Sequence, residues 1–426
     1  MKHFAIIDLK IIDTGVKLGY KCESCLLDTG IKFLDLGNQP ICNKFLNSLE
    51  EVKKERKYPL EVMFCTNCKL VQLISLPPAE EVFGSDFNYL SGATLERKKY
   101  FNEVAIDIIT KFELHASDFV LDIGSNDGTL LLPFKEHGIG VLGVDPAPKA
   151  CEVANSLGIK TINSRFEDGI DRILIETKDK LKIITAFNVI AHTGTIHNFL
   201  LGIEKLLAHN KNATFIVVVP YLPRLIENCE YDTIYHEHAR YYTITSMQNL
   251  FRMHNLFIYD AKETALYGGS IIVYAKAYNT EQSTNLKQLI KNEEKFNDIK
   301  IYEAFRENVF NNSKKLHNLI ETMKNDGKKI VGVGAPMKSS TLLNYCKIND
   351  QLLEYITEVN PLKINTYTPG THIKVISEDA IFKKMPDAIL ILSWDVANRI
   401  IRTFKDKGYK GIFIIPIPSV KIINSE

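Results

Sequence analysis

The chain has 426 residues, too many for one hydrophobic core of ordinary size, so we expect two or three domains. Its formal net charge of +1 and charged content of 24% argue against the strongly basic surface that binds a nucleic-acid polymer or an anionic membrane. No apolar run reaches the roughly 18 residues that a membrane span needs and no signal-peptide pattern is seen, so we expect a cytoplasmic protein with no membrane contact and no obligatory protein partner.

The first 80 residues carry two C-x-x-C units, Cys22–Cys25 and Cys65–Cys68, separated by 39 residues. Each unit can aim two thiolates at one cation, and two units complete a tetrahedral site suited to Zn²⁺. Four protein ligands leave no open coordination position, so we predict a structural metal in a zinc-ribbon-like module over residues 1–80. A redox C-x-x-C or accidental pairs are the alternatives. The other four cysteines are expected to be buried thiols.

The Pro77-Pro78 pair predicts a boundary, after which we place a second domain at residues 81–285. It begins with an aromatic segment at 83–89 and a helical pattern at 93–112. Apolar strands then alternate with helical stretches, which indicates an α/β, doubly wound parallel sheet. The predicted strands are 119–123, 140–144, 159–162, 181–187 and 213–219.

A smaller, Rossmann-like α/β lobe is expected at residues 286–426. The lysine-rich stretch 280–329 reads as helices that connect it to the preceding domain, and a second glycine turn follows at 332–340. Further apolar runs predict strands at 353–357, 388–393 and 411–415.

The segment Val120–Gly128 is the most informative motif of the chain. It predicts a strand and a tight glycine turn, and the next strand closes at Asp145; ligands of such folds sit outside the carboxyl ends of the strands. Asp122 and Asp127 place carboxylates beside the turn, which disfavours a pyrophosphate and favours a cationic sulfonium. We therefore predict S-adenosylmethionine as the ligand, with Asp145 accepting hydrogen bonds from its ribose hydroxyls. The alternative is a glycine turn without a ligand. The predicted cofactor contacts are Asp122, Gly124, Asn126, Gly128, Asp145, Phe166 and Asn188.

The densest cluster of proton-handling side chains is Tyr235-His236-Glu237-His238. Histidine is the usual general base near neutral pH. In an extended segment His236 and His238 would share a face, and Glu237 would support a histidine only in a loop or turn. A plain histidine pair or a second metal site are the alternatives. The spacing of the two histidines does not match a zinc protease motif.

Three other segments could border the reacting centre. Asn188 and His192 follow a predicted strand end, although Asn188 could equally be a helix N-cap. Tyr89 could form a lid or wall, or pack as a core aromatic, and Tyr267 begins a Gly-Gly-Ser turn. The second glycine turn lacks acidic residues and carries Lys338, Ser339 and Ser340, so it could cradle a diphosphate or be purely architectural.

These motifs together resemble the zinc-containing, S-adenosylmethionine-dependent sugar C-methyltransferases, which methylate C3 of nucleotide-activated 4-keto deoxysugars. The similar segments run through nearly the whole chain: Phe33–Gly37, the four cysteines, Leu70–Leu73, Leu121–Gly128, Asn188–His192, Ile234–His238, Gly268–Ser270, Gly334–Pro336, Thr341–Tyr345 and Tyr367–Ile373.

The resemblance implies that His238 is the base or its close assistant. It makes residues 81–285 a class I methyltransferase domain, and it places Tyr235, Glu237, His192 and Tyr89 around the sugar. It also implies that the C-terminal lobe helps to hold the nucleotide sugar. The candidate substrate contacts are Lys338, Ser339, Ser340 and Tyr267. The chain departs from the family pattern at Tyr267 and Ile272, where histidine and arginine are usual, and at Gly194-Thr195, where an aspartate is usual. These departures leave open which sugar and which nucleotide are used.

We therefore expect a C-methyltransferase whose substrate is a nucleotide-diphosphate-linked keto-sugar. The carbonyl would acidify C3, His238 would take the proton, and the enolate would accept the methyl group. The rivals are a sugar O- or N-methyltransferase with the same cofactor, a non-catalytic zinc-ribbon ligand-binding module, and a dehydrogenase that uses the second glycine turn.

Overall fold

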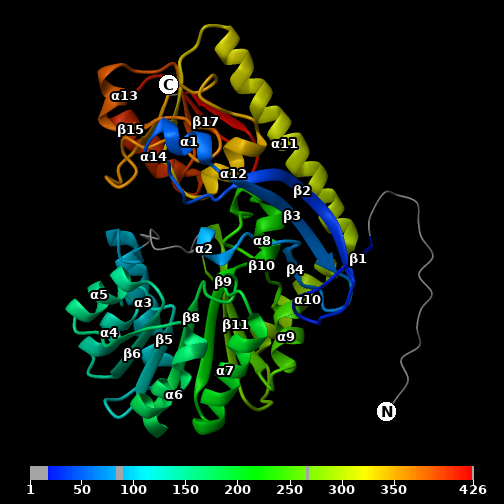
Figure 1. Ribbon diagram of the computed structural model, residues 1–426, viewed down its shortest axis with the longest axis vertical. Helices are drawn as coiled ribbons and strands as arrows, with labels where there is room; N and C mark the ends of the chain where they lie inside the picture. The colour runs from blue at the N-terminus through cyan, green and yellow to red at the C-terminus, as the bar shows by residue number, and fades with distance from the viewer. Residues whose placement is uncertain (1–17, 83–89, 265–267, 425–426) are drawn as a thin grey trace.

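The computed structural model describes residues 18–82, 90–264 and 268–424, and three β-sheets organise them (Figure 1). The central sheet forms the lower lobe of Figure 1 and the C-terminal sheet forms the upper lobe. The N-terminal sheet runs along one side of the molecule beside the long helix α11 (Ile299–Asn325) and reaches both lobes. Tyr89 and Tyr267 lie outside the described residues.

The N-terminal sheet has the strand order β1-β2-β3-β4-β10 and is antiparallel at each pairing. Its long hairpin, β2 and β3, carries the two metal-site turns near one end. The fifth strand comes from far along the chain, because Arg240 pairs with Gln72 and Tyr241 with Val71. The bounds are β1 Leu18–Tyr20, β2 Gly30–Pro40, α1 Leu49–Lys54, β3 Lys57–Cys65, β4 Val71–Leu73, α2 Ala79–Val82 and β10 Arg240–Tyr241.

The central sheet has the order β11-β12-β9-β8-β5-β6-β7. The five predicted strands are confirmed and run parallel: β5 Phe119–Ile123, β6 Gly140–Asp145, β7 Thr161–Asn163, β8 Leu181–Phe187 and β9 Thr214–Pro220. Sequence reasoning missed β11 (Phe257–Thr264) and β12 (Ser270–Lys276). β12 inserts antiparallel between β9 and β11, so the sheet is mixed.

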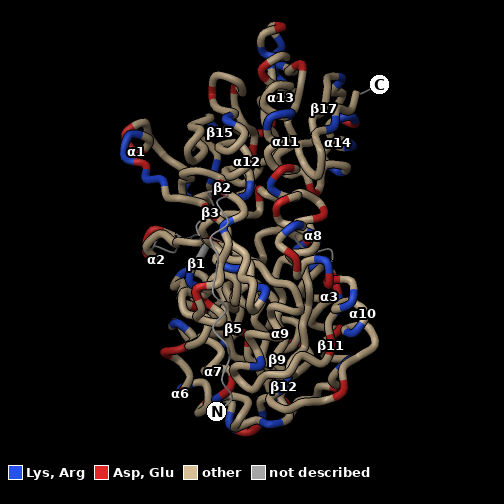
Figure 2. The backbone as a smooth tube through the Cα atoms, turned by 90° about the vertical axis from the view of Figure 1, so that its right-hand side faces the viewer, with Lys and Arg blue, Asp and Glu red and all other residues tan. Residues whose placement is uncertain are grey.

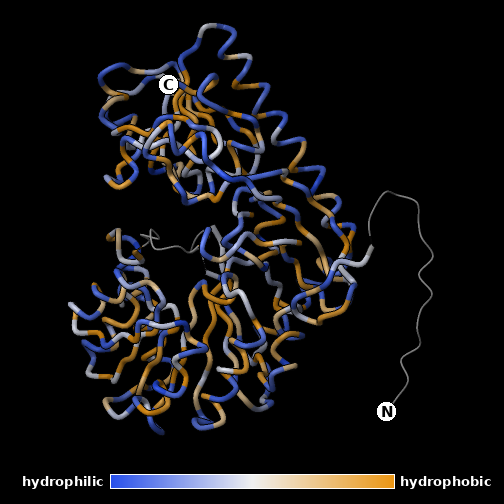
Figure 3. The backbone as a smooth tube through the Cα atoms, viewed as in Figure 1, coloured by the Kyte–Doolittle hydropathy of each residue, from blue (hydrophilic) through white to orange (hydrophobic). Residues whose placement is uncertain are grey.

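The strands of the central sheet are largely hydrophobic in the colouring of Figure 3. Successive residues of a strand point to opposite faces of its sheet, and helices cover both faces. Val120 and Ile183 face a core formed with α3 and α4, whereas Leu121 and Ile184 face a core formed with α6, α7, α9 and α10. The helices are α3 Leu95–Lys111, α4 Leu131–Glu136, α5 Pro148–Ser156, α6 Phe166–Thr177, α7 Ile196–His209, α8 Leu222–Glu227, α9 Ile244–Arg252 and α10 Thr284–Glu293.

The C-terminal sheet has the order β15-β14-β13-β16-β17-β18 and is parallel except for β18. The predicted runs at 353–357, 388–393 and 411–415 correspond to β14, β16 and β17. The bounds are β13 Ile330–Val333, α12 Lys338–Tyr345, β14 Ile356–Glu358, β15 Val375–Ser377, α13 Asp379–Lys383, β16 Ala388–Ile391, α14 Ala397–Asp406, β17 Ile412–Ile415 and β18 Lys421–Asn424.

One hydrophobic core is shared between the N-terminal sheet and the C-terminal lobe. Phe33 and Phe64 of the hairpin pack against Tyr302 of α11, with ring centroids 5.0 and 4.7 Å apart. The same buried cluster continues into α12 and β13. The N-terminal sheet is therefore held by packing as well as by its metal site.

The surface carries both signs of charge. Basic and acidic residues are intermixed along both lobes in the view of Figure 2. Among the described helices, none combines the length and apolarity needed to cross a bilayer.

Candidate active site

The glycine turn after β5 has a backbone that requires its glycines. Gly124, Asn126 and Gly128 have φ angles of 69°, 49° and 75°, in the left-handed region that glycine and asparagine tolerate. The N–H groups of Gly124 and Ser125 donate to the carbonyl oxygen of β6 residue Val144. A Cβ on Gly124 would lie 2.5 Å from a Val189 methyl group, so the turn packs directly on the segment that follows β8.

Two buried carboxylates lie at the ends of the neighbouring strands. Asp122 accepts a hydrogen bond from the Thr185 hydroxyl at 2.6 Å, and burial raises its pKa to about 7. Asp145 accepts the N–H groups of Asn126 at 2.9 Å and Ala147 at 2.8 Å, one on each oxygen. Each carboxylate oxygen has a second lone pair. Asp145 is therefore held in a fixed orientation with acceptor capacity left for the two hydroxyls of a ribose.

Asp127 has a structural role in addition to the negative charge that it places beside the turn. One of its oxygens accepts the Gly92 N–H at 2.8 Å, and the other accepts the Thr129 hydroxyl at 2.6 Å. The Asn126 side chain accepts the Ser91 N–H at 2.8 Å. These bonds fasten residues 91–92 onto the glycine turn, so Asp127 and Asn126 both act as anchors.

Asn188 begins the segment after β8 in a left-handed conformation, with φ of 57° and its N–H bonded to the Val218 carbonyl at 2.7 Å. Its side-chain oxygen is buried and has no hydrogen-bond partner within the described part of the chain. The helix N-cap alternative is wrong, because α7 begins after Thr195. An unsatisfied buried acceptor at a strand end fits a ligand that donates a hydrogen bond.

Phe166, a predicted cofactor contact, begins α6. Its buried ring packs against Phe199 of α7 with centroids 5.0 Å apart. Its apolar side chain therefore contributes to the core of the sheet, and its contact with the cofactor stays a prediction.

The histidine cluster forms a turn. The His238 N–H donates to the Tyr235 carbonyl at 2.9 Å, so the chain reverses direction over residues 235–238. His236 Nε2 lies 3.2 Å from the Pro59 carbonyl of β3, whereas His238 Nδ1 lies 2.9 Å from the Thr233 carbonyl. The two histidines therefore have separate partners, and the segment adopts the turn alternative rather than the extended one.

His238 carries its lone pair on Nε2. A carbonyl oxygen only accepts, so Nδ1 must hold the proton that it donates to Thr233. Nε2 then accepts the Tyr235 hydroxyl at 3.0 Å, and the two rings pack with centroids 4.1 Å apart. The His192 ring lies 4.9 Å from the His238 ring. Burial lowers the pKa of His238 to about 4 and that of His192 to about 3, so both are neutral at pH 7.

The Glu237 backbone forms a hydrogen bond with the His192 ring, whereas the Glu237 carboxyl has a different partner. Its carboxyl accepts the Cys42 thiol at 3.5 Å, and burial raises the pKa of Glu237 to about 7. The charge of Lys363 acts in the opposite direction, and the Lys363 ammonium donates to the Ala335 carbonyl at 2.7 Å. Glu237 thus faces the N-terminal sheet and the second glycine turn.

The second glycine turn has partners within the chain. The Lys338 ammonium pairs with Asp395 at 3.0 Å and lies 3.9 Å from the centre of the Trp394 ring. Ser339 and Ser340 are buried, and the Ser339 hydroxyl donates to the Pro336 carbonyl at 2.7 Å. The Ala335 N–H donates to the Glu358 carboxylate at 2.8 Å. These contacts favour the architectural alternative, and the role of the three residues in holding a diphosphate stays a prediction.

The four predicted metal ligands come together. All four sulfur atoms lie within 4.8 Å of one another, with Cys22 to Cys68 at 3.4 Å and Cys25 to Cys65 at 3.6 Å. A tetrahedral Zn²⁺ with Zn–S bonds near ~2.3 Å would place its sulfurs roughly 3.8 Å apart. Leu26 and Lys69, one after each C-x-x-C, adopt φ of 62° and 67°, which lets each turn fold back on its first cysteine. The residues fit a closed zinc site.

Comparison with known proteins agrees with this geometry. Family models match in succession a zinc binding domain at residues 22–83, a methyltransferase domain at 97–260 and a C-methyltransferase C-terminal domain at 265–418. The C-methyltransferase NovU of Streptomyces niveus is 29% identical over 414 residues, which cover 95% of this chain and 97% of that protein.

Solved structures also resemble part of the chain. The magnesium protoporphyrin IX methyltransferase ChlM of Synechocystis PCC 6803 is 14% identical, with 42% of this chain and 78% of that chain covered and a TM-score of 0.31. The CcbJ methyltransferase of Streptomyces caelestis is 10% identical, with 42% and 90% covered and a TM-score of 0.33. Both scores are too low to carry the assignment, which comes from the domain matches and the full-length relative. The chain is an S-adenosylmethionine-dependent C-methyltransferase with an N-terminal zinc-binding domain.

Proposed function

We propose that this enzyme methylates C3 of a nucleotide-diphosphate-linked 4-keto deoxysugar. One observation carries the proposal: a neutral, buried His238 with its lone pair on Nε2 lies beside the segment that borders the glycine turn. Carbon methylation needs a base that removes a proton from carbon, and a ketone next to that carbon makes the proton acidic. The similarity to NovU along nearly the whole chain supports a C-methyltransferase of this kind.

The described residues suit the methyl donor. Asp145 would accept the ribose hydroxyls and Asn188 would accept a donor group through its unsatisfied oxygen. The carboxylates Asp122 and Asp145 give this strand edge a negative potential that favours a sulfonium over a phosphate. Bound S-adenosylmethionine would supply the methyl group, whose bond to sulfur breaks as its bond to C3 forms.

The Tyr235–His238 pair would move the proton. As the C3–H bond breaks, the proton passes to the Tyr235 oxygen while the Tyr235 hydroxyl proton passes to His238 Nε2. The electron pair of the C–H bond forms the enolate. The resulting imidazolium keeps its Nδ1–H on the Thr233 carbonyl, which stabilises the positive charge. His192 would line the same space through its contact with His238.

The proposal is tested with His238→Asn and nucleoside-diphosphate 4-keto-6-deoxysugars as acceptors. We expect less than about a tenth of wild-type turnover, because a general base contributes on the order of 100-fold or more, with S-adenosylhomocysteine binding unchanged by calorimetry. The wild-type enzyme should also exchange C3–H for solvent deuterium when the ketone binds without donor. His317→Asn, on the remote helix α11, is the matched control. A product methylated on oxygen or nitrogen, or a His238→Asn variant with more activity than this limit, would contradict the proposal.

A further inference from the structure

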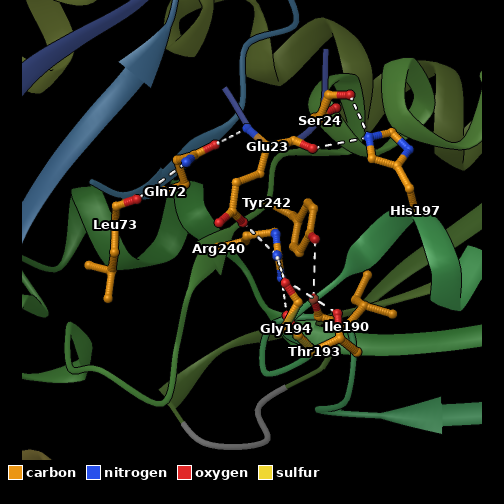
Figure 4. A network of polar contacts seen from close by, with 10 residues as sticks. All are labelled: Glu23, Ser24, Gln72, Leu73, Ile190, Thr193, Gly194, His197, Arg240 and Tyr242. Atoms are coloured by element: carbon orange, nitrogen blue, oxygen red, sulfur yellow. Dashed lines mark hydrogen bonds and ion pairs between the residues drawn. The ribbon is translucent and has the colours of Figure 1, made fainter. Parts of the chain in front are cut away.

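Arg240 is a buried charge that the proposed reaction does not use. It lies in β10, its side chain is 1% exposed, and it is among the largest fully buried side chains. Its guanidinium pairs with the Glu23 carboxylate at 2.5 Å and donates to the Thr193 carbonyl at 2.7 Å (Figure 4). Glu23 stands between the metal ligands Cys22 and Cys25. Arg240 therefore connects the first metal turn to the segment that follows His192.

Two neighbours of Arg240, Ala239 and Tyr242, hydrogen-bond to that same segment. The Ala239 N–H donates to the Ala191 carbonyl at 2.9 Å, and the Tyr242 hydroxyl donates to the Ile190 carbonyl at 3.3 Å. With Arg240 on Thr193, three contacts from residues 239–242 hold residues 190–193. His192 lies within this held stretch, with its ring against His238.

The first metal turn also contacts the start of α7 directly. His197 Nε2 lies 3.0 Å from the Glu23 carbonyl and 2.9 Å from the Ser24 carbonyl (Figure 4). The Glu23 N–H in turn donates to Gln72 at 2.8 Å, which ties the turn to β4. The metal turn thus contacts residues 188–197, the His192 segment, at two points. The Glu23 side chain reaches Thr193 through Arg240, and the backbone carbonyls of Glu23 and Ser24 lie beside His197.

The ion pair makes these contacts interdependent. A guanidinium buried to this extent is stable only while its partners stay in place. Glu23 keeps its position because Cys22 and Cys25, its near neighbours, are fixed at one metal. Loss of the metal would free the turn, leave Arg240 without its carboxylate and release the Thr193 carbonyl.

We propose that Glu23 and Arg240 are positioning residues through which the metal-bearing Cys22–Cys25 turn holds the His192 segment in place. The zinc site then orders the reacting centre in addition to stabilising its own domain. The ordering is a property of the chain and does not depend on which sugar is methylated; only its effect on turnover rests on the proposed function.

Amide hydrogen exchange of the full-length zinc protein tests the proposal. Removing the metal with a chelator should raise exchange in peptides spanning 188–197 by about tenfold or more, since local opening controls these rates. Glu23→Gln, which removes the charge but keeps the size of a partly exposed side chain, should cause the same rise while zinc content stays near one per chain. Strands β5 and β8 should be unchanged in both cases.

The matched control is Glu61→Gln, which removes an ion pair to Lys32 at 2.8 Å in the same sheet but away from Arg240. It should leave residues 188–197 as in the wild type. In Glu23→Gln, chelation should add less than about a twofold further rise at residues 190–193, because the side-chain connection through Arg240 to Thr193 is already broken. The backbone contacts of Glu23 and Ser24 with His197 remain in this variant, so a further rise at residues 194–197 is expected. Unchanged exchange at 188–197 in zinc-loaded Glu23→Gln, or after chelation of the wild type, would overturn the proposal.

A turnover measurement separates this proposal from the proposed function. We expect Glu23→Gln to lower kcat about tenfold with an unchanged KM for the acceptor, as for a misplaced reacting group. Glu23→Asp, which keeps the charge, should recover part of this loss. If the product were methylated at a different position, the proposed reaction would be wrong, but the hydrogen-exchange result at residues 188–197 would still hold. Full kcat in Glu23→Gln would overturn the link between the metal turn and the reacting centre.

Discussion

Replacing Tyr235 with phenylalanine tests how the proton reaches His238. The substitution removes only the hydroxyl that donates to His238 Nε2 at 3.0 Å and keeps the ring packing at 4.1 Å between centroids. If the hydroxyl relays the proton, its loss should lower kcat by on the order of 100-fold or more, the range of a general acid–base contribution. This corresponds to about 2.7 kcal/mol in the activation free energy.

The stability cost of this substitution should be much smaller. A hydrogen bond between neutral buried groups contributes about 1 kcal/mol to the free energy of unfolding. Tyr302→Phe is the matched control, because the Tyr302 hydroxyl is equally buried and donates to the Phe296 carbonyl at 2.8 Å, far from His238. Both variants should lose similar stability in urea, and only Tyr235→Phe should lose turnover.

Single-turnover rates of methyl transfer, with the acceptor saturating, give the measurement. Removing the hydroxyl also opens the Nε2 lone pair to the substrate. A direct attack of His238 on the C3 proton would therefore leave kcat of Tyr235→Phe within about threefold of wild type. That result would refute the relay and leave His238 as the immediate base.

Two further predictions concern binding and pH. Asp145→Asn should weaken S-adenosylhomocysteine binding by roughly 10- to 100-fold in calorimetry, because charge-assisted hydrogen bonds contribute about 1.5–3 kcal/mol. The control Asp118→Asn, which alters an exposed carboxylate before β5, should bind within about twofold of wild type. Equal affinities of the two variants would exclude Asp145 from the cofactor site. Burial lowers the pKa of His238 from 6.5 to about 4, so the stability it contributes is present above pH 6.5 and lost as the pH falls toward 4. Between pH 7.5 and 5, urea unfolding of wild type should lose about 2 kcal/mol more than that of His238→Asn, since each pH unit below 6.5 costs up to about 1.4 kcal/mol. Equal losses in the two proteins would mean that the pKa of His238 is not lowered in the native state.

The fold was largely predictable because each buried parallel strand has a short apolar run as its sequence. The runs at 119–123 and 181–187 match β5 and β8 in full. The direction of β12 was hidden because it depends on tertiary pairing with β9 and β11. An apolar run alone does not indicate whether a strand will be parallel or antiparallel to its neighbours. The two-residue strand β10 has too few residues to show any period, so its addition to a distant sheet was equally hidden.

The candidate site was predictable where its parts are local in sequence. The metal ligands follow from two C-x-x-C units, and Asp145 follows from its place at a strand end. The Cys42–Glu237 contact joins residues 195 positions apart, and the Arg240–Glu23 pair is similarly distant, so no spacing rule could indicate them. The only local signal was a charged Arg240 beside two tyrosines, a sequence context that favours burial. The ion pair of Lys338 with Asp395 was equally hidden, because the two residues follow different strands.

The reactive turn at 235–238 is held by all three parts of the chain, which gives a physical reason for their combination. The N-terminal sheet supports it through the Pro59 carbonyl on His236 and the Cys42 thiol on Glu237. The C-terminal lobe supports it through the Thr341 hydroxyl, which donates to the Ile234 carbonyl at 2.8 Å. The central domain supplies His192 and the strand edge with Asp145. A turn carrying a base must keep its geometry within a fraction of an ångström, and a solvent-exposed loop on one domain would not hold it so closely. The methyltransferase sheet would therefore present the donor by itself, whereas the proposed base His238 would depend on the zinc-binding and C-terminal domains on either side.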